Sequence, residues 1–497
     1  MLKQAVALTA LLWNGTLQAV SLVEGCHYRC EGVNLCDSDG ACVAPSDCDN
    51  TKIEIKSSNL VEIRGHPACR VTLQQIMDVD PDAVSKDGTE YFLNKRIWIR
   101  DGSVLEIHGA SQASSPGAAV SLLKMRSDAD RVAPIISWHG KVSIKDTAIT
   151  SWDNTINGPD ERLEGRAFIA ALSAESTNGN GVVYTSRMDV LDSEISYLGN
   201  EGDYHNDIDN DYGLVWKVRG YDDRYPEDGD LGLFDRVGVY GILKRNKLHH
   251  NYMGAYCYGM KGDAEWSDNE VYNNTLNGIN PQDNSDGMTI HDNHVHDNGW
   301  HGIEYSKRCE GAVVYNNVVE DNMRAGIFFH RSTNYAVAYN NTCRRNAEGD
   351  FGIVESTGVK VYDNVMEGGK YGIRLSLGAN DCEVYDNVMT KSTRYGVFTY
   401  MGSDEAEASA DWGGRPLNNT IRNNYIADPL ELKGVAIKEA DDTKVIDNVF
   451  EGIDTLRFDD SYETLVQENT LPPGVAFDLE NGATLAAGSQ SSTEDEE

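Results

Sequence analysis

The sequence predicts an all-β protein built as a parallel β-helix, a solenoid whose chain passes through short strands once every 23 or 24 residues. Three observations support this fold class: a fixed period, short alternating apolar runs, and a Gly-apolar pair in each repeat, such as Gly302-Ile303. A period of this length is typical of solenoids, in which each repeat buries its apolar face against its neighbours. The period is marked most clearly by asparagines: Asn246, Asn269, Asn293, Asn317, Asn341, Asn364 and Asn387.

The local pattern within each repeat favours strands over helices. Apolar residues alternate over short runs and never keep helical spacing, which predicts short strands joined by turns. Asn tolerates left-handed backbone and suits tight turns, and stacked Asn side chains can hydrogen-bond from coil to coil. The other common solenoid of this period, the leucine-rich repeat, requires regularly spaced Leu that this chain lacks. We therefore expect coils stacked about 4.8 Å apart.

The ends of the chain differ from the repeats. Lys3 and the apolar run Ala5 to Trp13 predict a signal peptide over residues 1–21. A Cys-rich module is expected over 22–50, the β-helix over 51–475 and an acidic disordered tail over 476–497. The chain is thus expected to be secreted, to the extracellular matrix or cell wall. The clustered cysteines are Cys26, Cys30, Cys36, Cys42, Cys48 and Cys69.

The charge of the chain restricts its partners. The net charge is −36 and the isoelectric point is near 4.6, which argues against nucleic acid or an anionic membrane as a partner. No segment after residue 21 is long and apolar enough to span a membrane. A polyanionic substrate would need a local basic stripe. We expect a monomer, with a long loop over the groove at residues 204–230.

Side chains that point outward can be aligned from coil to coil, because they alternate along each strand. One predicted outward column holds Tyr256, Asn280, Glu304 and Phe328, and a second holds Tyr258, Gln282, Ser306 and His330. Asp283, Lys307 and Arg331 follow at the strand ends, and Arg374 points the same way further along. Because aromatic, amide, carboxylate, imidazole and cationic groups converge here, we interpret this face as the functional one, rather than as an ordinary solvated face.

Metal ligation is not expected. His291, His294 and His296 have a metal-like spacing, but alternation places them on one face only loosely, so turn or edge roles are favoured. The acidic run from Asp207 to Asp211 offers carboxylates of the kind that Ca²⁺ binds, although a solvent-exposed acidic loop is the favoured interpretation. We expect no required cofactor, with Ca²⁺ as the one candidate ion.

Several motifs together resemble one family. The segments Gly254 to Tyr258, Gly278 to Asp283, His296 to Ile303, Ser306-Lys307 and Gly326 to Ser332 are similar to the mannuronan C5-epimerases that act on alginate. The resemblance extends from about residue 138 to 397, and the secretory signal and Cys-rich head indicate the brown-algal type. It implies a right-handed β-helix that converts β-D-mannuronate to α-L-guluronate within the polymer.

The chain departs from the hallmark of that family, Tyr-Gly-x-Asp-Pro-His-Asp. Here Asn277, Asn280 and Gln282 replace the Tyr, the first Asp and the His. Amides can donate hydrogen bonds to a substrate carboxylate, but they cannot abstract a proton. Asn280 and Gln282 are therefore expected to bind the substrate, with Lys307 or Arg331, while the acid and base come from other residues of the groove.

The candidates for these roles follow from the same face. His330 is the first candidate base, Tyr258 its partner acid, and His301 an alternative base. The expected substrate-binding residues are Tyr256, Asn280, Gln282, Asp283, Glu304, Lys307, Arg331 and Arg374.

Two other functions remain open. A polyuronate lyase shares the first two chemical steps, and a catalytically inactive, polysaccharide-binding β-helix is favoured by the altered hallmark. A glycoside hydrolase is less favoured, because the outward columns offer few carboxylate pairs.

Overall fold

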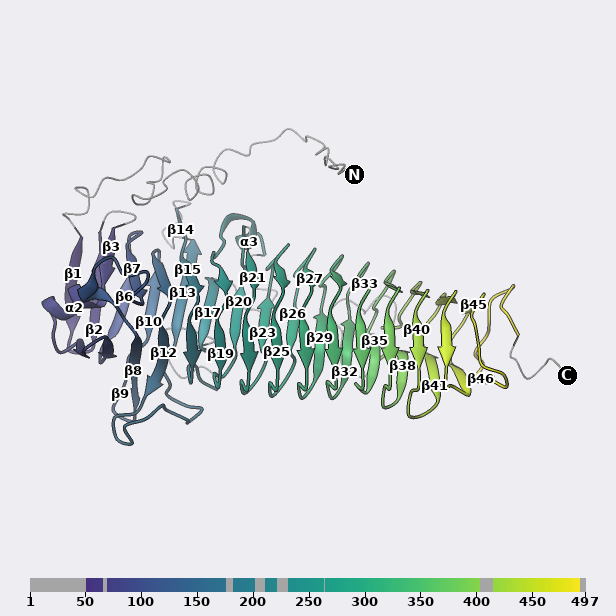
Figure 1. Cartoon of the computed structure of the whole chain (residues 1–497). Helices are drawn as coiled ribbons and strands as arrows, with labels where there is room; N and C mark the ends of the chain where they lie inside the picture. The colour runs from purple at the N-terminus through teal and green to yellow at the C-terminus, as the bar shows by residue number, and fades with distance from the viewer. Residues whose placement is uncertain are drawn as a thin grey trace, which may run out of the picture.

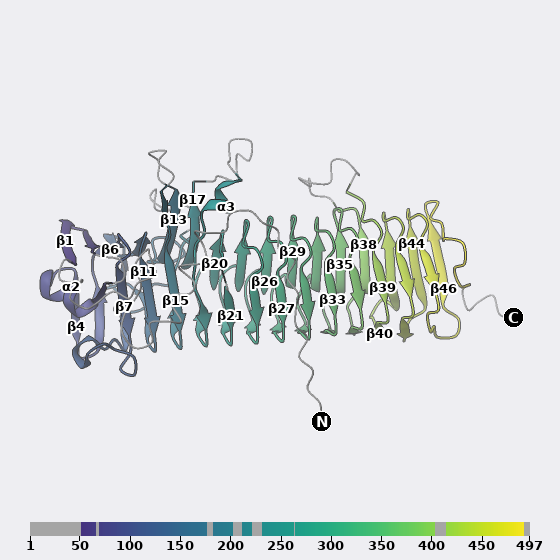
Figure 2. The ribbon, with the colours of Figure 1, turned by 90° about the horizontal axis from the view of Figure 1, so that it is seen from above.

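The chain winds into one long solenoid of parallel strands, shown side-on in Figure 1 and from above in Figure 2. The computed structural model describes residues 51–65, 69–175, 182–201, 211–220, 231–262, 264–402 and 414–491. Within these residues, three sheets run along the solenoid. The predicted signal peptide, the Cys-rich module and Asp207 to Asn210 lie outside the described residues. Cys69 is disulfide-bonded.

The first sheet carries the candidate functional face. Its described strands pair in parallel, except for the antiparallel pairs β1–β2 and β13–β14. They are β1 (Lys52–Ser57), β2 (Leu60–Arg64), β6 (Arg96–Ile99), β10 (Ile135–Trp138), β13 (Ile169–Glu175), β14 (Val183–Tyr184), β17 (Leu214–Arg219), β20 (Ala255–Tyr258), β23 (Ile279–Gln282), β26 (Ile303–Ser306), β29 (Ala325–His330), β32 (Gly349–Val354), β35 (Tyr371–Ser376), β38 (Tyr395–Tyr400), β41 (Lys433–Lys438), β44 (Thr455–Asp459) and β46 (Ala476–Glu480).

The second sheet contributes one short strand to each coil. Its described strands are β3 (Arg70–Thr72), β7 (Val104–His108), β11 (Lys141–Lys145), β15 (Arg187–Leu191), β18 (Leu243–Lys244), β21 (Glu265–Ser267), β24 (Thr289–His291), β27 (Val313–Tyr315), β30 (Val337–Tyr339), β33 (Lys360–Tyr362), β36 (Glu383–Tyr385), β39 (Thr420–Arg422), β42 (Lys444–Ile446) and β45 (Leu465–Gln467).

The third sheet follows the second in each coil. Its described strands are β4 (Val84–Asp87), β5 (Glu90–Leu93), β8 (Leu122–Asp128), β9 (Arg131–Val132), β12 (Ala148–Trp152), β16 (Glu194–Ser196), β19 (Lys247–His249), β22 (Glu270–Tyr272), β25 (His294–His296), β28 (Val318–Glu320), β31 (Thr342–Arg344), β34 (Val365–Glu367), β37 (Val388–Thr390), β40 (Tyr425–Ala427) and β43 (Val449–Glu451).

The repeated asparagines form a buried ladder between the second and third sheets. Asn293 Nδ2 donates to Asn317 Oδ1 at 3.0 Å, and the same bond recurs from Asn246 to Asn469. The predicted stacking of asparagines is therefore confirmed. A second ladder, five residues further along each coil, was not foreseen; it joins Asn274, Asn298, Asn322 and Asn346.

The turn role expected of the ladder asparagines needs correction. The left-handed residue is the one before each ladder position, as at Asp268 (φ 57°), Asp292 (φ 53°) and Asn316 (φ 56°). The ladder residue itself is buried, and its amide satisfies backbone groups of its own and the adjacent coils. Asn is thus kept at these positions for its buried hydrogen bonds rather than for its backbone freedom.

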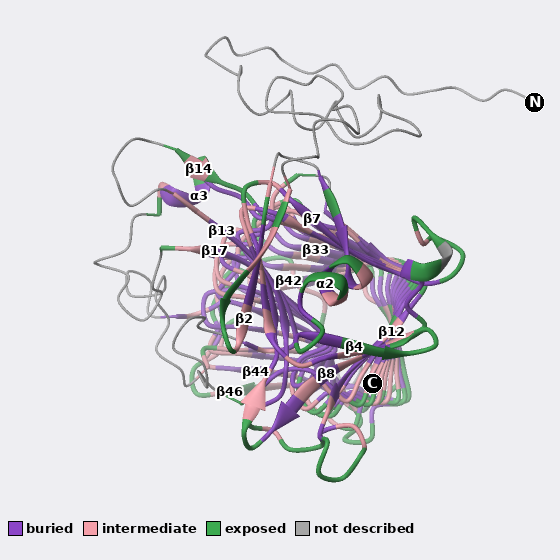
Figure 3. Ribbon diagram, turned by 90° about the vertical axis from the view of Figure 1, so that its left-hand side faces the viewer, coloured by how far each residue is buried: buried purple, intermediate pink, exposed green. Residues whose placement is uncertain are grey.

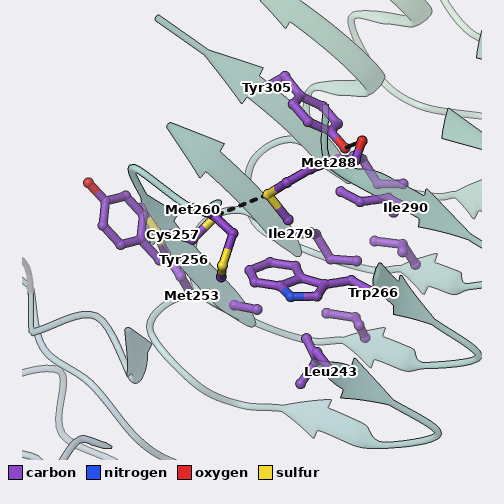
Figure 4. Packing of buried hydrophobic residues seen from close by; sticks show 14 of the residues in the cluster. Leu243, Met253, Tyr256, Cys257, Met260, Trp266, Ile279, Met288, Ile290 and Tyr305 are labelled. Atoms are coloured by element: carbon purple, nitrogen blue, oxygen red, sulfur yellow. Dashed lines mark hydrogen bonds between the residues drawn. The ribbon is translucent and has the colours of Figure 1, made fainter. Parts of the chain in front are cut away.

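The Gly-apolar pairs mark a place where adjacent coils come very close. A Cβ on Gly302 would lie 2.4 Å from Val319 Cγ1 and 2.8 Å from the carbonyl oxygen of Gly326. Only glycine fits such a contact, so the pair fixes the register between coils. Figure 3 shows the buried residues gathered inside the coil. In Figure 4, Cys257, Trp266, Met288 and Tyr305 pack together in this core.

The two ends of the solenoid are closed differently. Helix α2 (Leu73–Val79) lies across the N-terminal end, as Figure 3 shows, and buries Leu73 and Ile76. At the other end, β46 (Ala476–Glu480) pairs in parallel with β44. The predicted boundary at residue 475 is therefore too early, because the coil continues into the segment that was expected to be a disordered tail.

The segment 204–230 was expected to be a loop, but its middle is part of the sheet. Leu214–Arg219 forms β17, which pairs with β13 and β20. Its buried residues include Leu214, Val215 and Trp216, whose apolar pattern was hidden by the Asp- and Asn-rich flanks. Short helices also occur at η2 (Pro116–Ala118) and α3 (Leu233–Arg236). In the part of the chain that the structure describes, no helix has the length and apolar character needed to cross a membrane.

Candidate functional site

The outward columns on the first sheet have the predicted register. Tyr256 pairs with Asn280, and Glu304 pairs with Phe328. In the second column, Tyr258 pairs with Gln282, Gln282 with Ser306, and Ser306 with His330. Placement on adjacent coils is therefore as expected, and the hydrogen bonds decide what each side chain can do.

Glu304 is the centre of the polar contacts on this face. Its carboxylate accepts a hydrogen bond from Asn277 Nδ2 at 2.7 Å, and its Oε1 lies 3.6 Å from His330 Nδ1. Burial disfavours the charged form of Glu304, but the contacts with His330 and Asn277 outweigh it, so the pKa of Glu304 lies below its ordinary value. Glu304 is therefore a carboxylate at neutral pH.

The Nδ1 atom of His330 is directed at protein groups, and Nε2 is the second ring nitrogen. Its Nδ1 lies 3.4 Å from Ser306 Oγ as well as close to Glu304. The side chain is 23% exposed, and its ring stacks against Phe328. Because the ionised Glu304 only accepts, it favours the tautomer with the proton on Nδ1. In the neutral ring, Nε2 then carries the lone pair that the role expected for His330 requires.

His301 is held in a state that suits donation rather than proton abstraction. Its Nδ1 accepts a hydrogen bond from the backbone N–H of Ala325 at 3.0 Å, so in the neutral ring the proton is on Nε2. Burial lowers the pKa of His301 to about 4, and the ring stacks on Phe328 with 4.4 Å between centroids. This argues against the expected base role of His301, because Nδ1 is occupied and Nε2 carries a proton.

Asn280 does not present its amide to the groove as expected, whereas Gln282 is partly exposed and bonds to Asn280. Asn280 is fully buried, and its Nδ2 donates to the backbone carbonyl of Glu304 at 2.9 Å. Its Oδ1 accepts from Gln282 Nε2 at 3.0 Å. The two amides bond to each other and to the backbone, so they brace the groove from below. Binding of the substrate carboxylate through Asn280 would require these bonds to break.

Asp283 also has a structural environment. It is fully buried at the end of β23, and its carboxylate forms an ion pair with Arg308. A buried, paired carboxylate offers nothing to an anionic polymer, so the expected substrate-binding role of Asp283 is not supported by its position.

The two tyrosines at the upstream end are covered. The rings of Tyr256 and Tyr212 pack edge to face with 5.1 Å between their centroids, and Tyr258 lies against Phe234 of α3. Figure 4 shows Tyr256 on the opposite side of β20 from Trp266. Tyr258 is three coils from His330, or about 14 Å. That distance is too large for the pair to act on two faces of one sugar carbon, which argues against Tyr258 as the partner acid of His330.

The cations of this face differ in how far they are neutralised. Arg331 Nε lies 3.9 Å from a carboxylate oxygen of Glu355. Lys307 follows directly after β26 and has a left-handed backbone (φ 62°). Arg374 is on the first column, two coils beyond Phe328, and its guanidinium lies 5.6 Å from that ring. Gly352 stands between them, and a Cβ there would lie 2.5 Å from the Phe328 ring. Arg374 has no carboxylate partner among the described residues.

An aromatic surface further along the same sheet was missed by sequence reasoning. Phe398 pairs with Arg374, and its ring stacks on Tyr400 at 4.9 Å and on Tyr371 at 4.9 Å. Phe398 and Tyr400 are partly exposed, and Arg394 lies over the ring of Tyr395 beside them. The signal was available, since Phe398 follows the pair Gly396-Val397 in the outward position.

Comparison with known proteins supports the fold. A family model described as "Right handed beta helix region" matches residues 175–338, and one described as "Periplasmic copper-binding protein (NosD)" matches residues 345–473. Among curated proteins, no sequence matches this chain. The solved structure of the periplasmic alginate epimerase AlgG is similar, with a TM-score of 0.61 and 16% identity over 86% of this chain and 85% of that chain. A point mutant of AlgG has a TM-score of 0.62 and 18% identity over 76% of this chain and 82% of that chain. These matches confirm the right-handed parallel β-helix.

Proposed function

We propose that this protein is a secreted enzyme that acts on alginate and converts β-D-mannuronate to α-L-guluronate within the polymer by epimerisation at C5. The observation that carries the proposal is the Glu304–His330 pair, with Arg374 beside it, on the outward face of a β-helix. The fold is similar to that of AlgG, which is itself described as an alginate epimerase.

The first requirement of the reaction is to neutralise the sugar carboxylate. The C5 proton is acidic only if the negative charge that develops after its removal can spread into the carboxyl group. Arg374 provides a cation, and the Nε2–H of His301 provides a neutral donor that remains uncharged because its pKa is near 4. Both are donors of the kind that stabilise a developing oxyanion.

The second requirement is a base close to C5. His330 Nε2 takes the C5 proton, and the C–H electron pair moves into the carboxyl group to form an enediolate. Glu304 stabilises the imidazolium formed in this step, since its carboxylate faces Nδ1. A water molecule on the solvent side of the sugar returns a proton to C5 from the opposite face. The hydroxide that remains takes the proton from His330, so the site is restored.

The polymer itself would lie along the first sheet. The partly exposed rings of Phe398 and Tyr400 give the C–H faces of neighbouring sugars a flat apolar surface. Arg374 places positive charge along the same face, while Arg394 lies over the ring of Tyr395 and 3.6 Å from the carboxylate of Glu431. These groups can hold several sugars while one residue is placed at His330.

A second candidate, a polysaccharide-binding β-helix without activity, is favoured by the hydrogen bonds of the altered hallmark. Asn280 and Gln282 bond to each other and to the backbone, and so leave no reactive group on β23. A lyase is the third candidate. It would follow the same proton abstraction by eliminating the 4-linked sugar.

Proton NMR of polymannuronate incubated with the secreted protein in deuterated water distinguishes the three. Guluronate signals with deuterium at C5 support the epimerase. Unsaturated products that absorb in the ultraviolet identify a lyase. A polymer that binds but stays unchanged identifies the binding protein. The variant His330→Gln serves as the control, because the proposed enzyme loses its base while the groove keeps its shape.

A further inference from the structure

A cluster on the third sheet, outside the candidate groove, combines two histidines with a carboxylate. His294 and His296 lie on the same outward face of β25, separated by one residue. Glu270 of the preceding coil pairs with His294, and Glu320 of the following coil pairs with His296. Side chains of three adjacent coils therefore meet at one place.

His296 has a ring nitrogen that is buried and unused. Its Nδ1 lies 2.7 Å from the carboxylate of Asp297, which only accepts, so in the neutral ring the proton is on Nδ1. The Nε2 atom then carries a lone pair. It is buried and makes no hydrogen bond to any described residue, and the nearest carboxylate oxygen, of Glu270, is 3.9 Å away. A buried lone pair without a partner is costly unless something binds it.

His294 has the same arrangement in reverse. Its Nε2 lies 3.0 Å from Glu320 Oε1, which leaves Nδ1 as the acceptor of the neutral ring. The centroids of the His294 and His296 rings are 4.2 Å apart, and Tyr272 stacks on His296 with an interplanar angle of 2°. Histidines that bind metals commonly donate their other N–H to a carboxylate, which fixes the tautomer and the ring orientation. Both histidines here have such a carboxylate.

We propose that Glu270, His294 and His296 form a binding site for a divalent transition metal, with Zn²⁺ as the ion that suits these ligands. One ligand atom from each of the three residues lies within 4.8 Å of the others. Tetrahedral Zn²⁺ with ligands at about 2.1 Å requires separations of about 3.4 Å, so each side chain moves by about 1 Å to close on the ion. All three side chains are partly exposed and can move this far. A water molecule completes the coordination.

The ligand set also excludes Ca²⁺ as the preferred ion. Calcium takes six to eight oxygen ligands, whereas this cluster offers two imidazole nitrogens and one carboxylate. Imidazole favours Zn²⁺ and its neighbours in the transition series. The bound ion would connect β22 to β25 and so link two adjacent coils, independently of what the groove on the first sheet does.

The expectation of no metal site treated three histidines as one group, although His291 lies on a different strand from His294 and His296. His291 belongs to the second sheet, and both of its ring nitrogens face carboxylates: Asp292 at 2.6 Å and Glu265 at 3.0 Å. It therefore has no nitrogen to offer. His294 and His296 are on a different strand and do share a face. This contrast makes His291 a matched control.

The test is to measure Zn²⁺ binding to the untagged full chain by isothermal titration calorimetry and by equilibrium dialysis with metal analysis. We expect His296→Gln to bind one equivalent of Zn²⁺ fewer than the unsubstituted chain. Glu270→Gln should raise the Kd for that same ion at least tenfold. His291→Gln should keep it. Zinc held by the cysteines near the N-terminus would remain in all variants, so the difference between variants isolates this site.

Cobalt provides an independent readout. The equivalent lost in His296→Gln should carry the visible absorption of tetrahedral Co²⁺ without the charge-transfer bands that thiolate ligands produce. The inference is overturned if the unsubstituted chain binds no Zn²⁺. It is also overturned if His296→Gln and Glu270→Gln bind as many equivalents, equally tightly, as the unsubstituted chain, or if His291→Gln loses the same equivalent. Far-UV circular dichroism of each variant confirms that the fold is intact.

Discussion

The contact between Glu304 and His330 makes the sharpest prediction about the groove. Glu304→Gln keeps the shape of the side chain and an acceptor for Asn277, but it removes the negative charge that faces His330 Nδ1 at 3.6 Å. At an effective dielectric constant of about 20, two unit charges at that distance attract with about 4.6 kcal/mol. Solvent around the partly exposed His330 reduces this to about 2–4 kcal/mol.

In the proposed reaction, that energy is lost only when His330 becomes charged, during abstraction of the C5 proton. The prediction is therefore a fall in kcat of about 30- to 1,000-fold with little change in KM. The assay is the rate at which guluronate appears in polymannuronate, followed by proton NMR. The matched control is Glu194→Gln, because Glu194 also faces a histidine, His249, at 3.3 Å, but on the third sheet. The reasoning is refuted if Glu304→Gln keeps activity within threefold, or if Glu194→Gln loses as much.

Three further predictions concern binding, stability and pH. Arg374→Met should raise KM about 10- to 150-fold, which is the contribution of a charge-assisted hydrogen bond from the guanidinium to the sugar carboxylate. Arg422→Met removes a similar stacked arginine from the second sheet and should leave KM unchanged. Equal KM values for the two variants would contradict a role of Arg374 in binding the carboxylate. Asn293→Ala leaves the backbone N–H and the Nδ2 of Asn269 without an acceptor, and should lower the free energy of unfolding in urea by about 3 kcal/mol. The control Asn316→Asp, at an exposed position, should lower it by less than about 0.5 kcal/mol. Because the pKa of His301 falls from 6.5 to about 4 on folding, its contribution to stability is complete above pH 6.5 and is lost as the pH falls toward 4. The difference in unfolding free energy between the unsubstituted chain and His301→Gln should change by about 3 kcal/mol over that range, and a constant difference would show that His301 is not buried as a neutral ring.

The columns of the groove were predictable because the repeat in the sequence sets the register between adjacent coils. In the coils of β23, β26 and β29, the Gly-Ile pair marks the point where two coils touch, so the residue after the pair points outward. The pair Gly352-Ile353 is displaced by two residues, since Gly352 lies opposite Phe328 and Ile353 opposite Phe329. Counting from that point placed Glu304 beside Phe328, and Ser306 between Gln282 and His330. Once one inward-facing residue of a strand is known, the direction of every other side chain in that strand follows from the alternation.

The hydrogen bonds within the groove were not predictable in the same way. The state of His301 depends on a backbone N–H of the next coil, at Ala325, and Asp283 is neutralised by Arg308. Neither residue type nor spacing in the sequence predicts such contacts. The burial of Tyr258 depends on α3, whose position relative to the sheet is not encoded in the repeat. The sequence therefore predicted which side chains share this face, but not the hydrogen bonds and ion pairs that these side chains make.

The net charge of −36 bears on how such a chain meets an anionic polymer. In the proposed complex, charges distributed over the long body repel the polymer at a distance, while Arg374 attracts one carboxylate at contact. Salt separates the two effects, because the Debye length falls from about 30 Å at 0.01 M to about 10 Å at 0.1 M, and contact pairs are screened much less. We therefore expect kcat/KM on polymannuronate to rise as NaCl increases from about 0.01 to 0.1 M, with kcat nearly constant. A groove dominated by an extended basic stripe would give the opposite trend, so a steady fall in kcat/KM over this range would show that the local cations, rather than the acidic body, control the encounter.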